Sequence, residues 1–313
     1  MPETVKQIKT FLGFPNFSQL FPPPETGMYR YFEGADKFPF DFNAIHHSSI
    51  NAWWMAEYSL LVYCGKPEVE QVLTDLLGQQ NYSLFWLDSD DTNTQGFAVI
   101  TKDYVLITFR GTEFPRPTSI LKSPSELRDI GADILTGIKK LPPQIINNGT
   151  PTFENPVHPG FATAFQSIWP QLQNIISKSD SKPIWLTGHS LGAAIATLLA
   201  EQIADRVNGL YTFGSPCVGD SAFTRSFETK YRLGDKTFRY VHGNDAVPVA
   251  FTLLNKDYQH VGQLFHLDAG IRRGVFAQLM NLALASTIKL NQFDHAPILY
   301  SYECWNKIIK QDN

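Results

Sequence analysis

The sequence predicts an α/β fold in which a mainly parallel sheet carries helices on both faces. From residue 128 onward, helical and strand-like patterns alternate, as they do where helices connect parallel strands. The run at 182–187 is short, apolar and followed by glycine, which is typical of a strand buried on both faces. Two further runs, 96–101 and 104–110, are separated by only two residues, which predicts an antiparallel hairpin at one edge of the sheet.

The composition is that of an ordinary globular protein. Of 313 residues, 43% are hydrophobic and 18% are charged, and the formal net charge is -4. This charge lacks the basic character of a nucleic-acid-binding domain, so we expect no nucleic acid partner. No apolar run approaches the length of a membrane span. Because we find neither an internal repeat nor a linker, we predict a single domain over 1–313, with an arm and helices in 1–95 packed against the rest.

The N-terminal third is predicted to contain an arm and two helices. Residues 8–40 are rich in aromatics and prolines, which suits an extended arm packed on the body of the protein. Ser48 or Ser49 is suited to cap a helix through 52–61 that stops before Gly65. The other expected elements are a second helix ending at Leu77 before Gly78, a strand at 82–87, helices at 123–139, 160–179 and around 222–231, and strands at 210–213 and 238–242.

The N-terminus and the cysteines suggest a cytoplasmic location. Residues 1–7 lack the continuous apolar core of a signal peptide. Cys64, Cys217 and Cys304 are widely spaced and odd in number, so we predict reduced thiols packed as small hydrophobic side chains. We therefore expect a cytoplasmic protein, and the sequence leaves open a peripheral contact with membranes.

The pentapeptide G-H-S-L-G at 188–192 carries the clearest functional signal. It follows the apolar strand at 182–187 and precedes the Ala-rich helix pattern at 193–200. A sharp strand-to-helix turn with this pattern is a nucleophile elbow, in which the serine adopts a strained conformation and the flanking glycines leave room for it. Ser190 is therefore our candidate nucleophile. The free N–H groups of the new helix point toward negative charge that develops there.

A serine nucleophile needs a base, and the base needs an orienting carboxylate. Asp245 follows the predicted strand at 238–242, at the sheet edge where such sites lie, and is the leading acid. His295 occupies a polar turn and is a candidate base. His189 adjoins the nucleophile but points away from it, so we interpret it as a structural residue next to the substrate site. The alternatives left open by position alone are Asp220, Asp235 and Asp257 for the acid, and His260 and His266 for the base.

Beyond the pentapeptide, four ordered motifs make residues 97–305 resemble the class 3 lipases, a family of filamentous-fungal triacylglycerol lipases and many plant and bacterial relatives. The motifs are R-G-T at 110–112, R-D-I-G-A-D at 128–133, H-P-G-F at 158–161 and T-F-G-S-P-C-V-G at 212–219. In the second of them, Ile130 stands where the family has the Trp of W-x-x-D. The resemblance implies an α/β-hydrolase fold with a catalytic core at 97–305.

The resemblance also implies residue roles. Residues 241–248 match the family's acid loop and support Asp245, while His260 matches a structural H-x-G segment. His295 matches the late catalytic histidine. Thr112 and Leu191 would then supply the backbone N–H groups that hold the oxyanion.

These roles imply an ester hydrolase that works through an acyl-enzyme and needs no metal or organic cofactor. The expected substrate is a lipid acyl ester, and the sequence leaves open which lipid class and chain length. Two alternatives use the same fold: an acyltransferase with the same triad, and a lipase-like interaction protein without activity. The oligomeric state also stays open.

The segment 113–124 is expected to be a lid over the substrate groove, since the family's lid starts just after the oxyanion residue. Its apolar residues Phe114, Ile120 and Leu121 are predicted, with His189, to line the substrate site. The apolar stretch 275–290 is expected to be a core helix, or else an amphipathic rim facing lipid. Fungal members of the family are secreted and disulfide-bonded, which this sequence does not suggest.

Overall fold

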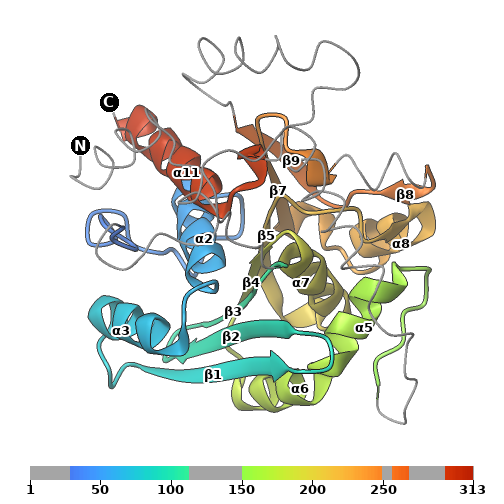
Figure 1. Cartoon of the computed structure of the whole chain (residues 1–313), viewed down its shortest axis with the longest axis horizontal. Coiled ribbons are helices and arrows are strands. Elements are labelled where there is room, and N and C mark those ends of the chain that lie inside the picture. The colour runs from blue at the N-terminus through green and yellow to red at the C-terminus, as the bar shows by residue number, and fades with distance from the viewer. Residues whose placement is uncertain (1–28, 113–149, 249–255, 268–292, 313) are drawn as a thin grey trace, which may run out of the picture.

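The computed structural model describes residues 29–112, 150–248, 256–267 and 293–312. These residues form a central seven-stranded sheet with helices on both sides (Figure 1). The strand order is β1 (Tyr82–Ser89), β2 (Thr94–Thr101), β3 (Val105–Phe109), β4 (Ile184–His189), β5 (Val207–Phe213), β7 (Thr237–His242) and β9 (Gln263–Leu267).

The sheet is parallel from β3 to β9, and the hairpin strands β1 and β2 run antiparallel at one edge. The predicted α/β architecture with an antiparallel edge is therefore confirmed. The strand β9 was not expected from the sequence. Its residues are largely exposed, so it lacks the apolar run that marks the buried central strands. A separate two-stranded sheet pairs β6 (Gly219–Asp220) with β8 (Tyr258–Gln259).

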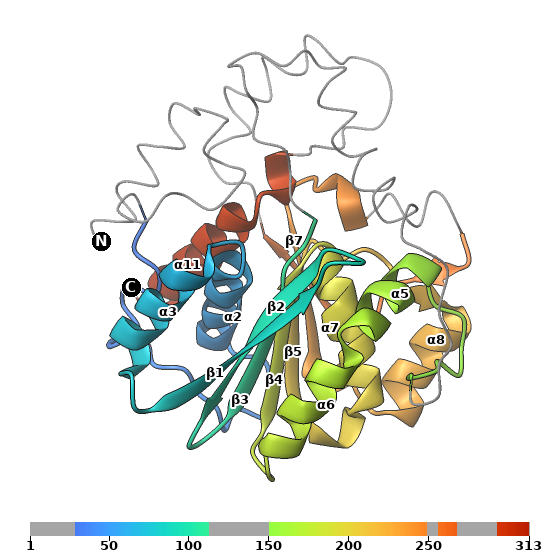
Figure 2. The ribbon, with the colours of Figure 1, turned by 60° about the horizontal axis from the view of Figure 1, so that its bottom comes forward.

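Helices cover the two faces of the sheet in separate groups. Figure 2 shows one group on either side of the strands. One group contains α2 (Ser49–Leu61), α3 (Lys66–Leu77) and α11 (Pro297–Asp312). The other contains α5 (Pro159–Ser167), α6 (Trp169–Lys178), α7 (Leu191–Gln202) and α8 (Ser221–Arg225), which continues as a turn of π-helix at Ser226–Lys230. Within the described ranges, the helices fall short of the length and apolar character that a membrane span requires.

Local sequence signals explain where the first helices begin and end. The Ser48 side chain accepts a hydrogen bond from the Asn51 N–H at 3.2 Å and so caps α2, as predicted. Helix α3 ends at Gly78, whose φ of 80° is in the left-handed region that favours glycine. Both helices agree with the sequence prediction.

The helical pattern predicted at 160–179 is confirmed, but it forms two helices and not one. They meet at Ile168, whose φ of -109° and ψ of 2° are not helical. Pro170 lies in the first turn of α6, where its missing N–H costs nothing, but it could not continue α5. The helix predicted at 123–139 and the stretch 275–290 lie outside the described residues.

The arm packs on the body, as predicted for the part that is described. Phe32 and Phe38 are buried in the cluster between the sheet and α2, together with Trp53 and Trp305. A second apolar cluster fills the opposite face of the sheet under α5 and α7. Cys217 and Cys304 are buried free thiols, and Cys64 is a partly buried one. The division of the whole chain into a single domain stays a prediction.

Candidate active site

The candidate residues come together at one edge of the sheet. Thr112 follows β3, Ser190 follows β4 and Asp245 follows β7. Because these three strands are parallel, their carboxyl ends meet at the same edge. His295 ends a short 3-10 turn immediately before α11.

Ser190 lies in the sharp turn between β4 and α7. Its φ of 57° and ψ of -125° are the strained geometry expected of a nucleophile elbow. A Cβ on Gly192 would lie 2.1 Å from the Phe109 carbonyl oxygen, and one on Gly188 would lie 2.4 Å from the Gly192 backbone. Glycine is therefore required at both positions of the motif. Within the described residues, the Ser190 hydroxyl is buried and makes no hydrogen bond.

The acid and the base predicted from the sequence are hydrogen-bonded to each other. His295 Nδ1 lies 2.8 Å from Asp245 Oδ2, and both side chains are about 1% exposed or less. The second carboxylate oxygen, Asp245 Oδ1, accepts the Val247 N–H at 2.9 Å. A carboxylate only accepts, so Nδ1 carries the proton, and Nε2 of the neutral ring is the nitrogen that can take up another.

Tyr300, which the sequence reasoning missed, also contacts the acid. Its hydroxyl donates to Asp245 Oδ2, the same oxygen that accepts from His295. The Tyr300 oxygen accepts the His242 N–H at 3.2 Å. Burial, followed by the nearby Asp245 charge, holds the pKa of Tyr300 well above its usual range, so the hydroxyl stays protonated and donates. An aromatic residue five positions after the base was the only available signal.

A second histidine and a second aspartate join the same two loops. His242 Nδ1 lies 3.2 Å from the Asp294 backbone oxygen and 3.7 Å from its carboxylate, and both side chains are buried. Asp294 Oδ2 accepts the Asn244 N–H at 2.8 Å. Each loop thus contributes one acid and one histidine, and the two pairs cross-link the turn after β7 to the turn before α11.

His189 is fully buried, and both of its ring nitrogens have protein partners. Nδ1 lies 2.8 Å from the Tyr63 hydroxyl, and Nε2 lies 2.7 Å from the His295 backbone oxygen. Burial, followed by the proximity of His295, holds the pKa of His189 well below its usual range. This geometry favours the structural role, and the prediction that His189 lines the substrate site stays a prediction.

The alternative residues lie in structural settings. The ring nitrogen Nε2 of His260 lies 2.9 Å from the Pro248 backbone oxygen. Burial lowers the pKa of His260 to about 4. His266 Nε2 lies 2.9 Å from the Gly243 oxygen. Asp220 caps α8 by accepting the N–H groups of Ala222 and Phe223. The rival Asp235 lies in a 3-10 turn, and Asp257 lies in a turn before β8.

The predicted oxyanion residues flank the nucleophile. Leu191 is the first residue of α7, where backbone N–H groups have no partner inside the helix. Thr112 follows Gly111, which approaches the nucleophile so closely that a Cβ on it would lie 3.0 Å from the Ser190 Cβ. The predicted lid residues Phe114, Ile120 and Leu121 lie outside the described residues.

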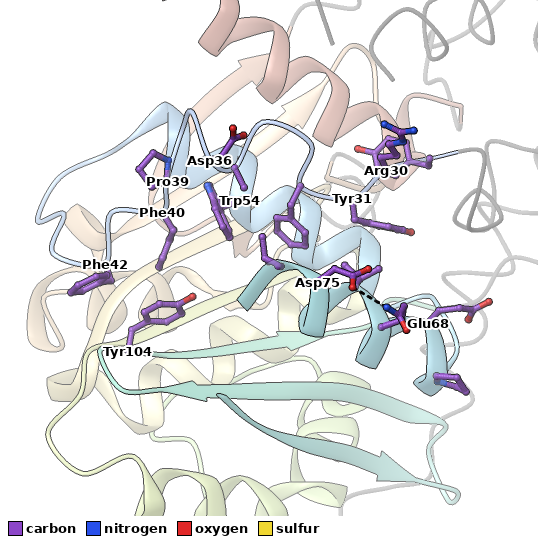
Figure 3. Close-up of a pocket in the computed structure, with 17 residues that line it drawn as sticks. Arg30, Tyr31, Asp36, Pro39, Phe40, Phe42, Trp54, Glu68, Asp75 and Tyr104 are labelled. Carbon is purple, nitrogen blue, oxygen red and sulfur yellow. Dashed lines mark hydrogen bonds between the residues drawn. The ribbon is translucent and has the colours of Figure 1, made fainter. Parts of the chain in front are cut away.

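A pocket elsewhere on the molecule is separate from this site. Figure 3 shows this space of about 880 Å³ between the arm, α2 and α3, with Phe40, Trp54 and Tyr104 on one side and Glu68 and Asp75 on the other. Ser190, Asp245 and His295 are not among the residues that line this pocket. The pocket is therefore not the candidate active site.

Comparisons with known proteins agree with the motifs and the fold. Residues 106–254 match the family model described as "Lipase (class 3)". These matches confirm the resemblance of the chain to the class 3 lipase family. The chain is 34% identical over 122 residues to secreted mono- and diacylglycerol lipase 1 of Fusarium solani, covering 36% of this chain and 35% of that protein. It is 31% identical over 152 residues to secreted mono- and diacylglycerol lipase LIP4 of Malassezia restricta, covering 46% of each.

The matches to these curated relatives thus span less than half of each relative's length. Among solved structures, the chain resembles the Lip2 lipase of Yarrowia lipolytica, with a TM-score of 0.50 and 21% identity over 73% of this chain and 82% of that one. It also resembles lipase II of Rhizopus niveus, with a TM-score of 0.50 and 16% identity over 80% and 95% of the two chains. These likenesses concern the fold, and the predicted α/β-hydrolase fold is confirmed.

The cytoplasmic location predicted from the sequence is contradicted. The relatives from Fusarium solani, Malassezia restricta and Penicillium cyclopium are all named as secreted lipases. The prediction rested on the first seven residues and on the three free cysteines. A low cysteine count does not identify a compartment in a chain of this size, because a large core does not need disulfides to be stable.

Proposed function

We propose that this protein is a serine-dependent carboxylic ester hydrolase that acts on lipid acyl esters. The observation that carries the proposal is the buried 2.8 Å contact between His295 and Asp245, at the sheet edge where Ser190 adopts the strained elbow geometry. A nucleophile, a base and an orienting acid are the groups that acyl transfer requires.

In the proposed reaction, His295 Nε2 accepts the proton of the Ser190 hydroxyl as the serine oxygen attacks the ester carbonyl. Asp245 holds the ring in the required tautomer and stabilises the imidazolium that forms. The backbone N–H groups of Thr112 and Leu191 hold the carbonyl oxygen as it becomes an anion. His295 then protonates the departing alcohol, and a water activated by the same ring hydrolyses the acyl-enzyme.

The substrate class is proposed from the relatives. The curated relatives with the matches described above are named as mono- and diacylglycerol lipases. We therefore propose partial acylglycerols as substrates, with a peripheral contact at the lipid surface where they reside. Hydrolysis should be measured on monoacylglycerols, diacylglycerols, triacylglycerols, a phospholipid and a galactolipid. A preference for either of the last two would contradict this assignment of the substrate while leaving the ester hydrolase intact.

The nucleophile is tested with Ser190→Ala. This change removes only a hydroxyl, and we expect it to lower turnover by about a millionfold if the triad acts as a unit. Hydrolysis of a soluble p-nitrophenyl ester and covalent labelling by an organophosphonate should both disappear, while the circular dichroism spectrum stays unchanged. Wild-type activity in this variant would refute the proposed function.

The base is tested by comparing two histidines. His295→Ala should be nearly as damaging as Ser190→Ala, whereas His260→Ala removes a side chain that contacts only the Pro248 carbonyl and should affect mainly stability. The same assays should include an added alcohol as acceptor. Acyl transfer that outruns hydrolysis would identify the protein as an acyltransferase instead.

A further inference from the structure

Three hydrogen bonds form a continuous chain behind the candidate active site. The Gly111 N–H lies 3.1 Å from the Tyr63 hydroxyl oxygen. The same hydroxyl lies 2.8 Å from His189 Nδ1, and His189 Nε2 lies 2.7 Å from the His295 backbone oxygen. This hydrogen-bond chain therefore begins at Gly111, beside Thr112. It passes through His189, the residue before Ser190, and ends on the backbone oxygen of His295, the proposed base.

The direction of each hydrogen bond follows from the chemistry of the groups. A backbone carbonyl only accepts, so His189 Nε2 carries the proton and donates to the His295 oxygen. In a neutral ring, Nδ1 is then an acceptor, so the Tyr63 hydroxyl must donate to it. The Tyr63 oxygen is left to accept the Gly111 N–H. For a neutral His189 ring, only one arrangement of protons satisfies all three contacts.

The surroundings of His189 maintain this neutral form. The ring is fully buried, and its centre lies 4.4 Å from that of His295 and 5.8 Å from that of Tyr300. Burial and the neighbouring His295 hold its pKa well below the usual range, so the ring stays neutral at and above the ordinary histidine pKa. If His295 becomes protonated during a reaction, it further disfavours a second positive charge on His189.

The first link also depends on a close approach that the sequence permits. A Cβ on Gly111 would lie 2.3 Å from the Tyr63 hydroxyl oxygen and 2.7 Å from the His189 backbone oxygen. Glycine at this position therefore allows Tyr63, in the turn after α2, to reach the loop after β3. The loop that bears the predicted oxyanion residue Thr112 is thereby tied to an aromatic side chain 48 residues earlier in the sequence.

We propose that Tyr63 and His189 are positioning residues, whose hydrogen-bond chain holds the loop bearing Thr112 and the backbone of His295 in register with Ser190. The inference rests on the proposed ester hydrolase function, because it assigns these two side chains to the same site. Neither touches the reacting atoms: Tyr63 acts through the Gly111 N–H, and His189 acts through the His295 carbonyl.

The proton arrangement can be tested without activity. In the wild-type full chain with ¹⁵N-labelled histidine, side-chain NMR should report His189 with the proton on Nε2 and an accepting Nδ1. This state should not change between about pH 6.5 and pH 9, since burial holds the pKa of His189 well below the ordinary value. Tyr63→Phe should shift the Nδ1 signal, because that nitrogen loses its donor. A proton on Nδ1, or titration within this range, would overturn the proposal.

The functional coupling can be tested with Tyr63→Phe, His189→Leu and the double variant. Tyr63→Phe removes the two hydrogen bonds made by the hydroxyl and should lower kcat on a soluble p-nitrophenyl ester about tenfold with little change in KM. His189→Leu should lower kcat about a hundredfold, and the double variant should be no worse than His189→Leu. His189→Gln, whose amide can still donate to the His295 carbonyl, should recover part of the loss.

Tyr31→Phe is the matched control. The Tyr31 hydroxyl lies 3.1 Å from the Sγ atom of Cys64, the residue after Tyr63, and takes no part in the three hydrogen bonds described above. Tyr31→Phe should leave kcat unchanged. If the fold-losses in kcat of the two single variants multiply in the double variant, the hydrogen-bond chain does not act as a unit. The same conclusion follows if Tyr31→Phe lowers kcat as much as Tyr63→Phe. If the wild type hydrolyses no ester while NMR gives the expected His189 tautomer, the proposed function fails and the hydrogen-bond chain stands.

Discussion

Asp245 Oδ2 accepts two hydrogen bonds, one from His295 Nδ1 at 2.8 Å and one from the Tyr300 hydroxyl. With the Val247 N–H on the other oxygen, the carboxylate has three donors in a site from which water is excluded. A buried carboxylate that meets its donors in this way is held in one orientation. The orientation of the His295 ring therefore depends on Tyr300, which acts through its hydrogen bond to Asp245.

We predict that Tyr300→Phe lowers kcat about tenfold, since a hydrogen bond to a charged group contributes about 1.5–3 kcal/mol and other donors to Asp245 remain. KM for a soluble p-nitrophenyl ester should change little, because Tyr300 is buried beneath the site. Tyr302→Phe, on the same helix, is the control and should retain wild-type kcat. Equal kcat values for Tyr300→Phe and wild type would mean that the hydroxyl does not position the acid.

At the scale of elements, α7 begins at the candidate nucleophile elbow and carries a buried carboxyl group near its other end. Its first residue, Leu191, follows the elbow, and the Ala-rich face packs closely on β3 through Gly192. Near its other end, Glu201 is 4% exposed, and burial raises the pKa of its carboxyl to about 7. Gln202, Glu154 and Lys230 are the polar and charged groups that act on it. The helix therefore buries a carboxyl group that prefers to be neutral.

This carboxyl predicts a pH dependence of stability. The folded state retains a proton on Glu201 up to about pH 7, whereas the unfolded chain releases it near the ordinary value of 4.5. The wild-type free energy of unfolding should therefore fall as the pH rises from about 4.5 to about 7. Glu201→Gln should remove that fall and be more stable at pH 8 by up to about 3 kcal/mol.

Urea unfolding of both proteins at pH 5 and pH 8 measures this difference. Glu70→Gln, at an exposed position on α3, controls for the loss of one negative charge. A stability difference between Glu201→Gln and wild type that is the same at both pH values would argue against the raised pKa.

At the scale of the whole molecule, one buried carboxyl joins three distant segments. Glu57 on α2 accepts hydrogen bonds from the Tyr29 hydroxyl and the Phe32 N–H of the arm, and from the Ser301 hydroxyl of α11. The Tyr29 and Ser301 hydroxyls also lie 3.1 Å apart. Since α11 follows His295, this network links the arm and the helix next to the proposed base to the face of the sheet that α2 covers.

We predict that Glu57→Leu lowers the free energy of unfolding by about 3 kcal/mol, because it leaves buried donors on the arm and on α11 without an acceptor. Glu57→Gln keeps one acceptor oxygen and should cost about 1 kcal/mol. Urea unfolding followed by tryptophan fluorescence measures both. If the leucine variant is as stable as the wild type, the network does not tie the arm to the body.

The sequence alone determined some features of the fold and the candidate site, and the tertiary structure decided others. The sequence by itself determined the elbow around Ser190, the α/β order and the first two helices, because glycine positions, caps and apolar runs act over a few neighbouring residues. It also ranked Asp245 and His295 first, through motifs that resemble a known family. It failed where Pro170 divides one helical pattern into two helices, and it missed β9, whose residues are largely exposed.

Only the tertiary structure decided which groups meet across the fold. Tyr63 lies 126 residues from His189, and Asp245 lies 55 residues from Tyr300, so no local pattern relates these partners. Their contacts exist because parallel strands bring their carboxyl ends to one edge, while α2 and α11 close over one face of the sheet. The buried role of His189 follows from that closure, since position beside a nucleophile is compatible with either contact with substrate or support from behind.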